Sequence, residues 1–315
     1  MSFGAELLVR SASLIALRSG VSPLFIGLTI VGFGTSSPEL GASVTATLNG
    51  LNDVSVGNVI GSNILNIALI LGITAIICPI KVQINEVRSD LKVVIIASFI
   101  PFSALVFGGV IPQIFGFVMV GGLVCYILRA YFIGRKTSES EKELLVTEVQ
   151  DTLNIKAFNN HLFNATWLNF LFIIIAFAML IIGSKVFVEN AVLLARAFEI
   201  SELVIGLTVV SAGTSLPELV TSLMAARRGS VDIAVGNVIG SNIFNLMGIL
   251  GVCAAIKPQA VSIQTLTLDA PVMLIASLAL LPIMKSGGVI SRREGAVLLV
   301  GYLVYLTILL CFPWS

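Results

Sequence analysis

The stretch GFGTSSPEL, residues 32–40, places a glutamate in the middle of an otherwise apolar run. It returns as SAGTSLPEL, residues 211–219, so that Glu39 and Glu218 occupy matching positions, each directly after a proline. A charge at the centre of a bilayer costs about 2.5 kcal/mol or more, and it is typical of an ion or proton pathway. The repeated acid therefore indicates one structural unit that is used twice around a buried charged site.

The repeat extends well beyond the two acids. At a shift of 179 residues, segment 22–40 agrees with segment 201–219 at 13 of 19 positions. Segment 53–66 agrees with segment 232–245 at 11 of 14 positions, with no gap between the two blocks. Because asparagine, serine and proline recur in register, hydrophobicity alone does not explain the similarity.

The composition predicts an all-α integral membrane protein. Of the 315 residues, 57% are hydrophobic and 11% are charged, and the mean hydropathy is +1.05. Soluble domains carry about 25% charged residues, more than twice this share. We predict about ten transmembrane helices. They lie at roughly 5–19, 23–48, 54–78, 91–109, 112–133, 168–195, 202–226, 231–256, 268–286 and 294–313.

The predicted spans divide into two repeats of five. Residues 1–133 form the first, residues 168–315 form the second, and a polar segment over 134–167 joins them. Because five is odd, the second repeat enters the membrane from the opposite face. Such inverted repeats are typical of secondary transporters, whose sites lie near the membrane midplane.

The distribution of positive charge predicts the orientation. If the amino terminus is outside, 14 of the 18 lysines and arginines fall in loops on the cytoplasmic side. The positive-inside rule therefore predicts a multi-pass protein of the cell membrane, with both termini outside and a cytoplasmic linker. No basic segment with interleaved aromatic residues indicates nucleic-acid binding, and no obligate protein partner is inferred.

The prolines predict opened backbone beside each acid. Because Pro38 has no N–H, the carbonyl of Gly34 loses its helical partner. Thr35 lies four residues before Glu39, so we expect the opened carbonyls and the carboxylate to share one helix face. The second copy repeats this arrangement.

The following span of each copy adds polar side chains and glycines. The polar residues recur every four positions: Asn58, Ser62 and Asn66, and then Asn237, Ser241 and Asn245. The glycines form pairs that allow close helix packing: Gly57 with Gly61, and Gly236 with Gly240. Hydrogen bonding between helices would give the same stripes, so that alternative stays open.

The ligand set is made of oxygen atoms only, which favours Ca²⁺ and Na⁺ over Mg²⁺. Zinc and copper prefer histidine or cysteine, and the single histidine, His161, lies in the polar linker. The serines beside the prolines have no partner histidine at hand, so an enzyme is disfavoured. No cofactor is expected.

The paired motifs GFGTSSPE with GNVIGSNILN, and SAGTSLPE with GNVIGSNIFN, resemble the two α-repeats of the cation/Ca²⁺ antiporter superfamily. The similarity is greatest to its prokaryotic sodium/calcium exchanger branch. The resemblance implies one Ca²⁺ site flanked by Na⁺ sites. It assigns shared carboxylates to Glu39 and Glu218, backbone oxygens to Thr35 and Thr214, Na⁺ sites to Ser36, Ser62, Ser215 and Ser241, outer carbonyls to Gly32 and Ser211, and central positions to Asn66 and Asn245.

Two departures from the family pattern bear on the mechanism. Some exchangers carry aspartate where this chain has Asn245, so the site here holds two formal negative charges. Exchange of three Na⁺ for one Ca²⁺ remains the expectation that the resemblance implies. The first span is also about half as long as in the family.

We therefore predict a secondary antiporter that exchanges Na⁺ for Ca²⁺ by alternating access. A proton-driven Ca²⁺ or cation antiporter on the same scaffold stays open, because a buried carboxylate can take up a proton in place of a cation. A passive cation channel is a further alternative. Transport against a gradient distinguishes it from both antiporters.

Overall fold

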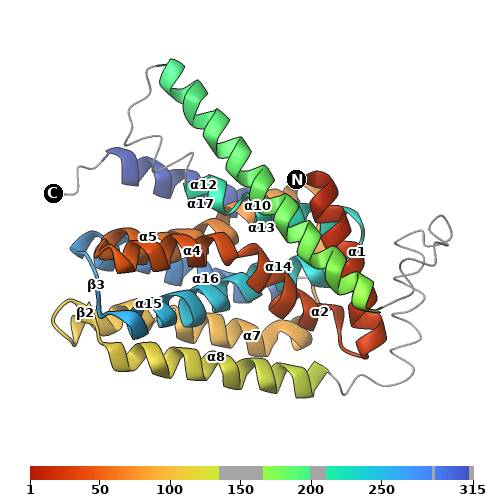
Figure 1. The fold of residues 1–315 in the computed structure, drawn as a ribbon, viewed down its shortest axis with the longest axis horizontal. Helices are drawn as coiled ribbons and strands as arrows, with labels where there is room; N and C mark the ends of the chain where they lie inside the picture. The colour runs from red at the N-terminus through yellow and green to blue at the C-terminus, as the bar shows by residue number, and fades with distance from the viewer. Residues whose placement is uncertain (135–165, 199–210, 286–287, 312–315) are drawn as a thin grey trace.

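The computed structural model describes residues 1–134, 166–198, 211–285 and 288–311, and it is a bundle of helices with four very short strands (Figure 1). The helices of the first half are α1 (Ser2–Ser19), α2 (Pro23–Ile26), η1 (Gly27–Val31), α3 (Gly32–Thr35), α4 (Ser37–Leu48), α5 (Asn52–Ile64), η2 (Leu65–Leu71), α6 (Gly72–Ile77), α7 (Ile84–Ala97), η3 (Ile100–Leu105) and α8 (Gln113–Gly134). Those of the second half are α10 (Thr166–Ala197), α12 (Ser211–Thr214), α13 (Leu216–Arg227), α14 (Val231–Ile243), η7 (Phe244–Ile249), α15 (Leu250–Ile256), η8 (Thr265–Asp269), α16 (Ala270–Lys285) and α17 (Arg292–Cys311). The predicted linker lies almost wholly outside the described residues.

The all-α membrane class is confirmed. In the part of the chain that the structure describes, six helices are long and apolar enough to cross a bilayer. They cover 52–77, 113–133, 167–194, 231–256, 265–285 and 292–311, and each lies within three residues of a predicted span. The total of ten spans stays a prediction.

The other four predicted spans differ in form. The first is a helix of 18 residues that carries three charged side chains, and the second is divided at Ser36. The bounds 91–109 are wrong, because α7 begins at Ile84 and ends at Ala97. A short 3₁₀-helix with Pro101 at its start follows, since proline cannot continue an α-helix without losing a hydrogen bond. The span predicted at 202–226 lies partly outside the described residues.

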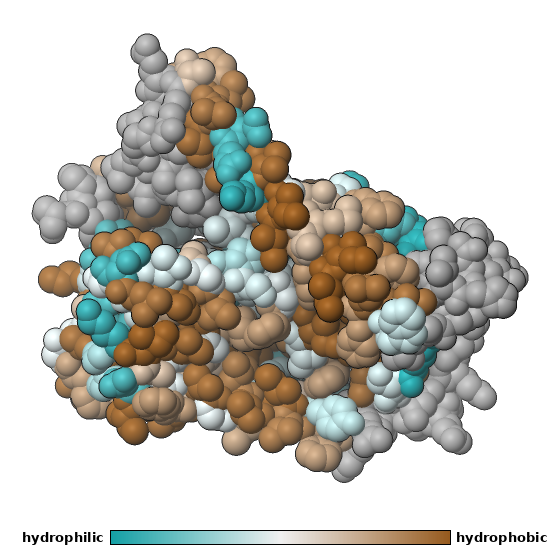
Figure 2. Space-filling view, viewed as in Figure 1, coloured by the Kyte–Doolittle hydropathy of each residue, from teal (hydrophilic) through white to brown (hydrophobic). Residues whose placement is uncertain are grey.

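The two helical segments with the polar stripes lie at the centre of the bundle. Within an apolar stretch of 18 residues, 72% of segment 52–77 and 78% of segment 231–256 is buried inside the protein. For 113–133, 167–194 and 292–311 the buried share is 22%, 22% and 17%, so these helices present apolar side chains outward. Hydrophobic residues cover much of the face shown in Figure 2. The asparagines and serines of the stripes are buried, except Asn58, which is half-buried.

Contacts between the halves are reciprocal. The hydroxyls of Ser98 and Ser277, which are 179 residues apart, lie 3.0 Å from each other. Strand β1 (Ile80–Lys81) pairs with β4 (Val289–Ile290), and β2 (Val110–Ile111) pairs with β3 (Gln259–Ala260). Because β3 repeats β1 and β4 repeats β2, these pairings are the same contact made twice, as a two-fold relation between the halves requires.

Each half also repeats a buried acid–tyrosine pair. The Tyr126 hydroxyl donates to Asp90 at 2.9 Å, and the Tyr305 hydroxyl donates to Asp269 at 2.9 Å. These bonds join α7 to α8 and η8 to α17. A charged or polar group in the bilayer requires such a partner, so each pair holds two helical segments of one half together.

Candidate functional site

The local backbone around the two acids is a helix break. Helix α3 ends at Thr35, Ser36 adopts φ −83° and ψ 8°, and α4 begins at Ser37. Ser215 repeats this geometry with φ −92° and ψ 9°. The predicted disturbance by proline is confirmed. The predicted single helix face for Thr35 and Glu39 is wrong, because the two residues belong to separate helices.

Each glutamate lies in the first turn of its helix. Glu39 is in the first turn of α4, and Glu218 is in the first turn of α13. The unpaired N–H groups of a helix start stabilise negative charge. The break therefore does more than open the backbone, since it also gives each carboxylate a favourable electrostatic position inside the bundle.

The two halves exchange hydrogen bonds at these acids. The Ser36 hydroxyl donates to Glu218 Oε1 at 2.9 Å, and the Ser215 hydroxyl donates to Glu39 Oε1 at 2.9 Å. Both glutamates are 1% exposed, and each is bonded to the serine at the helix break of the other half. The acids predicted from the two copies therefore meet in one site.

Several oxygens of this site have no hydrogen-bond partner among the described residues. They are the second carboxylate oxygens of Glu39 and Glu218 and the side-chain oxygens of Asn66 and Asn245. An unpaired buried polar group costs about 1–3 kcal/mol. A cation, or water around it, would supply the missing partner for every one of these oxygens.

The two asparagines lie on π-helical turns. Asn66 is in η2 and Asn245 is in η7, at matching positions of the repeat. Segment η2 contacts α13, which carries Glu218, and η7 contacts α4, which carries Glu39. π-Helical turns are frequent at functional sites. Each asparagine thus belongs to a segment that contacts the acid-bearing helix of the other half.

A second pair of asparagines positions the acids. Asn58 Nδ2 donates to the Glu39 carbonyl at 3.2 Å, and Asn237 Nδ2 donates to the Glu218 carbonyl at 3.2 Å. Thr35 Oγ1 also lies 3.0 Å from Asn237 Oδ1. The amides of Asn58 and Asn237 thus hold the starts of α4 and α13 in place. Both residues belong to the polar stripes that the sequence predicted.

Glycines allow the central helix of the second half to reach the break in the first. A Cβ on Gly240 would lie 2.3 Å from the Leu28 carbonyl oxygen, and one on Gly236 would lie 2.8 Å from that of Leu24. This close packing, which the glycine spacing predicted, brings the Ser241 hydroxyl 3.3 Å from the Gly32 carbonyl.

The remaining predicted positions are less fully defined. Around Gly57 and Gly61 no described atom lies within 4 Å of an added Cβ, and the segment matching Leu24–Val31 lies outside the described residues. Ser62 is buried on α5, which contacts α12. Ser211 begins α12 and Thr214 ends it.

Sequence reasoning missed Asn63 and Asn242. Both are buried, and each donates to the carbonyl four residues earlier at 2.7 Å. Their side-chain oxygens have no partner among the described residues. The identical GSN triplet in both copies was the available signal, but these residues fall outside the four-residue spacing of the stripes.

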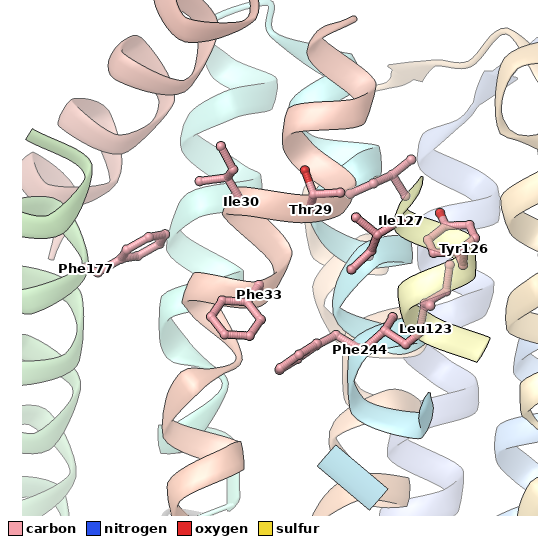
Figure 3. A pocket seen from close by; sticks show the side chains of 11 residues that line it. Thr29, Ile30, Phe33, Leu123, Tyr126, Ile127, Phe177 and Phe244 are labelled. Carbon is pink, nitrogen blue, oxygen red and sulfur yellow. The ribbon is translucent and has the colours of Figure 1, made fainter. Parts of the chain in front are cut away.

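Two acids are all that the site holds. Within the described ranges, no group of three or more His, Cys, Asp or Glu side chains gathers. A neighbouring pocket of about 310 Å³ has a mostly apolar lining that includes Phe33, Leu123, Phe177 and Phe244, so it is a separate feature (Figure 3). The charge available to a bound cation is therefore that of two carboxylates.

The serine–glutamate bonds give a first testable prediction. We expect Ser36→Ala to weaken apparent Ca²⁺ affinity about tenfold, because a hydrogen bond to a charged group contributes about 1.5–3 kcal/mol. Ser215→Ala should act equally, since it removes the reciprocal bond. Isothermal titration with Ca²⁺ measures both variants, and Ser37→Ala, which removes only a bond to the Phe33 carbonyl, is the control. Unchanged affinity in both variants would contradict the assigned geometry.

The comparisons with known proteins identify the family and agree with the fold. Residues 1–132 and 168–311 match the family model described as sodium/calcium exchanger protein. The putative antiporter CaxA of Alkalimonas amylolytica is 36% identical, covering 96% of this chain and 93% of its own. The sodium/calcium exchanger MaX1 of Methanosarcina acetivorans is 33% identical, covering 97% and 94%. A structure of the sodium-calcium exchanger NCX_Mj, soaked with 2.5 mM Na⁺ and 0.1 mM Ca²⁺, matches with a TM-score of 0.77 and 31% identity, covering 98% of this chain and 93% of the other.

Proposed function

Because this chain belongs to the sodium/calcium exchanger family, we propose that it is a secondary antiporter that exchanges Na⁺ for Ca²⁺ at the Glu39–Glu218 site. The observation that carries the proposal is the reciprocal pair of serine–glutamate bonds, which leaves one buried oxygen of each carboxylate without a partner. Carboxylate, hydroxyl and carbonyl oxygens in a flexible arrangement suit Ca²⁺ and Na⁺.

The ligand roles follow the repeat. The two glutamates serve both ions, and the backbone oxygens of Thr35 and Thr214 complete the Ca²⁺ position. The Na⁺ positions use Ser36, Ser62, Ser215 and Ser241, with the carbonyls of Gly32 and Ser211 at their outer ends. Asn66 and Asn245 lie between them and hold water or an ion with their amide oxygens.

Competition at one site couples the two ions. Because both need the same carboxylates, bound Na⁺ displaces Ca²⁺ and bound Ca²⁺ displaces Na⁺. Transport then requires that the loaded protein alternates between two open states. An ion drives this change only if its affinity differs between the states involved.

The charge of the site determines which step responds to voltage. One Ca²⁺ balances the two carboxylates, whereas three Na⁺ leave the loaded site with one positive charge, because Asn245 is neutral. We propose that the Na⁺-loaded step carries the charge. Both termini lie outside and the linker is cytoplasmic in this proposal, in keeping with the positive loops.

Flux into proteoliposomes tests the coupling ion. We expect ⁴⁵Ca²⁺ uptake against its gradient when a Na⁺ gradient is imposed at clamped pH, and no uptake from a pH gradient without Na⁺. Uptake driven only by the pH gradient would replace the proposal with a proton-driven antiporter. Uptake that ignores both gradients and never moves Ca²⁺ uphill would indicate a channel.

A further inference from the structure

The two halves match at the ion site but differ in how their first helices pack. Helix α1 packs along α13, the helix that begins beside Glu218. Its counterpart α10 makes no comparable contact with α4, the counterpart of α13, within the described residues. Figure 1 shows the end of α10 projecting past the other helices. The acid-bearing helix of the second half is therefore packed against a first helix, and the equivalent contact of the first half is not found among the described residues.

The interface between α1 and α13 includes several small side chains beside larger ones such as Leu8 and Ile15. Ala5, Ala12 and Ala16 of α1 share one buried cluster with Ala225 and Ala226 of α13. Small side chains allow close approach of two helices without deep interlocking. Apolar packing and any polar contact across this interface therefore hold the two helices together.

One polar contact of this kind joins the two helices. Glu6 in α1 accepts a hydrogen bond from Arg10 at 2.6 Å and a short one from Arg228, the residue that caps the end of α13. The Glu6 and Arg228 side chains are 27% and 34% exposed. The ion pair therefore attaches α1 to the far end of the helix that begins beside Glu218.

The other half lacks the residues for such a contact. At the shift of 179 residues, Lys185 matches Glu6 and Asn49 matches Arg228. Lysine and asparagine cannot form an ion pair. Lys185 instead lies 3.9 Å from Glu189 on its own helix, and both side chains are largely exposed. The ion pair is thus made only between α1 and α13, and the equivalent residues of α10 and α4 cannot form it.

We propose that the Glu6–Arg228 ion pair is a latch that holds one side of the ion site closed. Breaking it shifts the equilibrium toward opening between α1 and α13, because it removes a contact present in only one of the two states. The opening between α1 and α13 does not depend on the proposed function. Only its role as a step of ion transport rests on that function.

Accessibility of the interface tests the latch. In a background with the four cysteines replaced, Ala225→Cys places one thiol in the buried interface. We expect Arg228→Gln to speed its labelling by a hydrophilic maleimide about fivefold in nanodiscs, as for a partly exposed ion pair. Glu6→Gln should act alike, and the double variant should label no faster than either single one.

The controls separate the latch from loss of charge. Arg227→Gln, in the exposed neighbour, should leave labelling unchanged, and Arg228→Lys should retain most of the slow labelling. A rate in Arg228→Gln no higher than in Arg227→Gln, or additive effects of the two latch variants, would overturn the proposal. The labelling experiment does not measure ion flux. If labelling shows the expected changes but no Na⁺-driven uptake is found, the proposed function is wrong and the latch still stands.

Discussion

Replacing Glu39 or Glu218 by glutamine should abolish Ca²⁺ exchange while the protein still inserts and folds. Glutamine keeps the shape of the side chain and an oxygen that accepts the serine hydrogen bond, but it removes half of the negative charge of the site. Removing one partner from a buried charged contact costs about 3–5 kcal/mol, so we expect Ca²⁺ binding to weaken at least about 100-fold. Both ⁴⁵Ca²⁺ uptake and equilibrium Ca²⁺ binding measure the loss.

The matched control is Glu189→Gln. This acid lies on α10 with 59% of its side chain exposed, so it should leave uptake and binding unchanged. Because the two halves share the site, either glutamate variant alone should suffice. Na⁺-driven Ca²⁺ flux retained in both variants would exclude these acids as the ion ligands.

Substituting Gly240 by valine should destroy the packing on which the site depends. The added Cβ would lie 2.3 Å from the Leu28 carbonyl oxygen and 2.7 Å from its carbonyl carbon, which are backbone atoms that no rotamer change can move. Overpacking of a tight core typically costs about 1–3 kcal/mol, and occasionally more. Here it would also move Ser241 away from the Gly32 carbonyl, so ion binding should be lost together with stability.

Thermal unfolding in detergent and Ca²⁺ binding measure this variant together. Gly121→Val is the control, because an added Cβ at this position in α8 meets no atom within 4 Å. The control should unfold at the wild-type temperature. A Gly240→Val protein that unfolds and binds Ca²⁺ like the wild type would show that the close approach of α14 to η1 is not required.

The sequence predicted the fold class and the meeting of the two acids, because both follow from a pattern that occurs twice. The break at Ser36 could not be located in the same way. The apolar run over 23–48 continues through it, and a single turn residue leaves no mark in hydrophobic periodicity. Asn63 and Asn242 were passed over because they fall outside the four-residue spacing of the predicted stripes.

The contact between Glu6 and Arg228 could not be predicted from the sequence, for a different reason. Both residues are visible in it, yet 222 positions separate them, and nothing local indicates that α1 rests on α13. The repeat predicts contacts that both halves make. The repeat does not predict contacts that only one half makes. Such contacts are the ones that distinguish the two sides of the protein.

The hydroxyl contact between Ser98 and Ser277 has a consequence for the origin of the chain. Each serine meets the residue that stands at its own position in the other copy, as in a symmetric homodimer. An ancestral polypeptide of half this length, paired with itself in opposite orientations, would already have made this bond and the crossed serine–glutamate bonds. Gene duplication and fusion then preserve a working assembly, and Asn49 opposite Arg228 records where the two copies have since diverged.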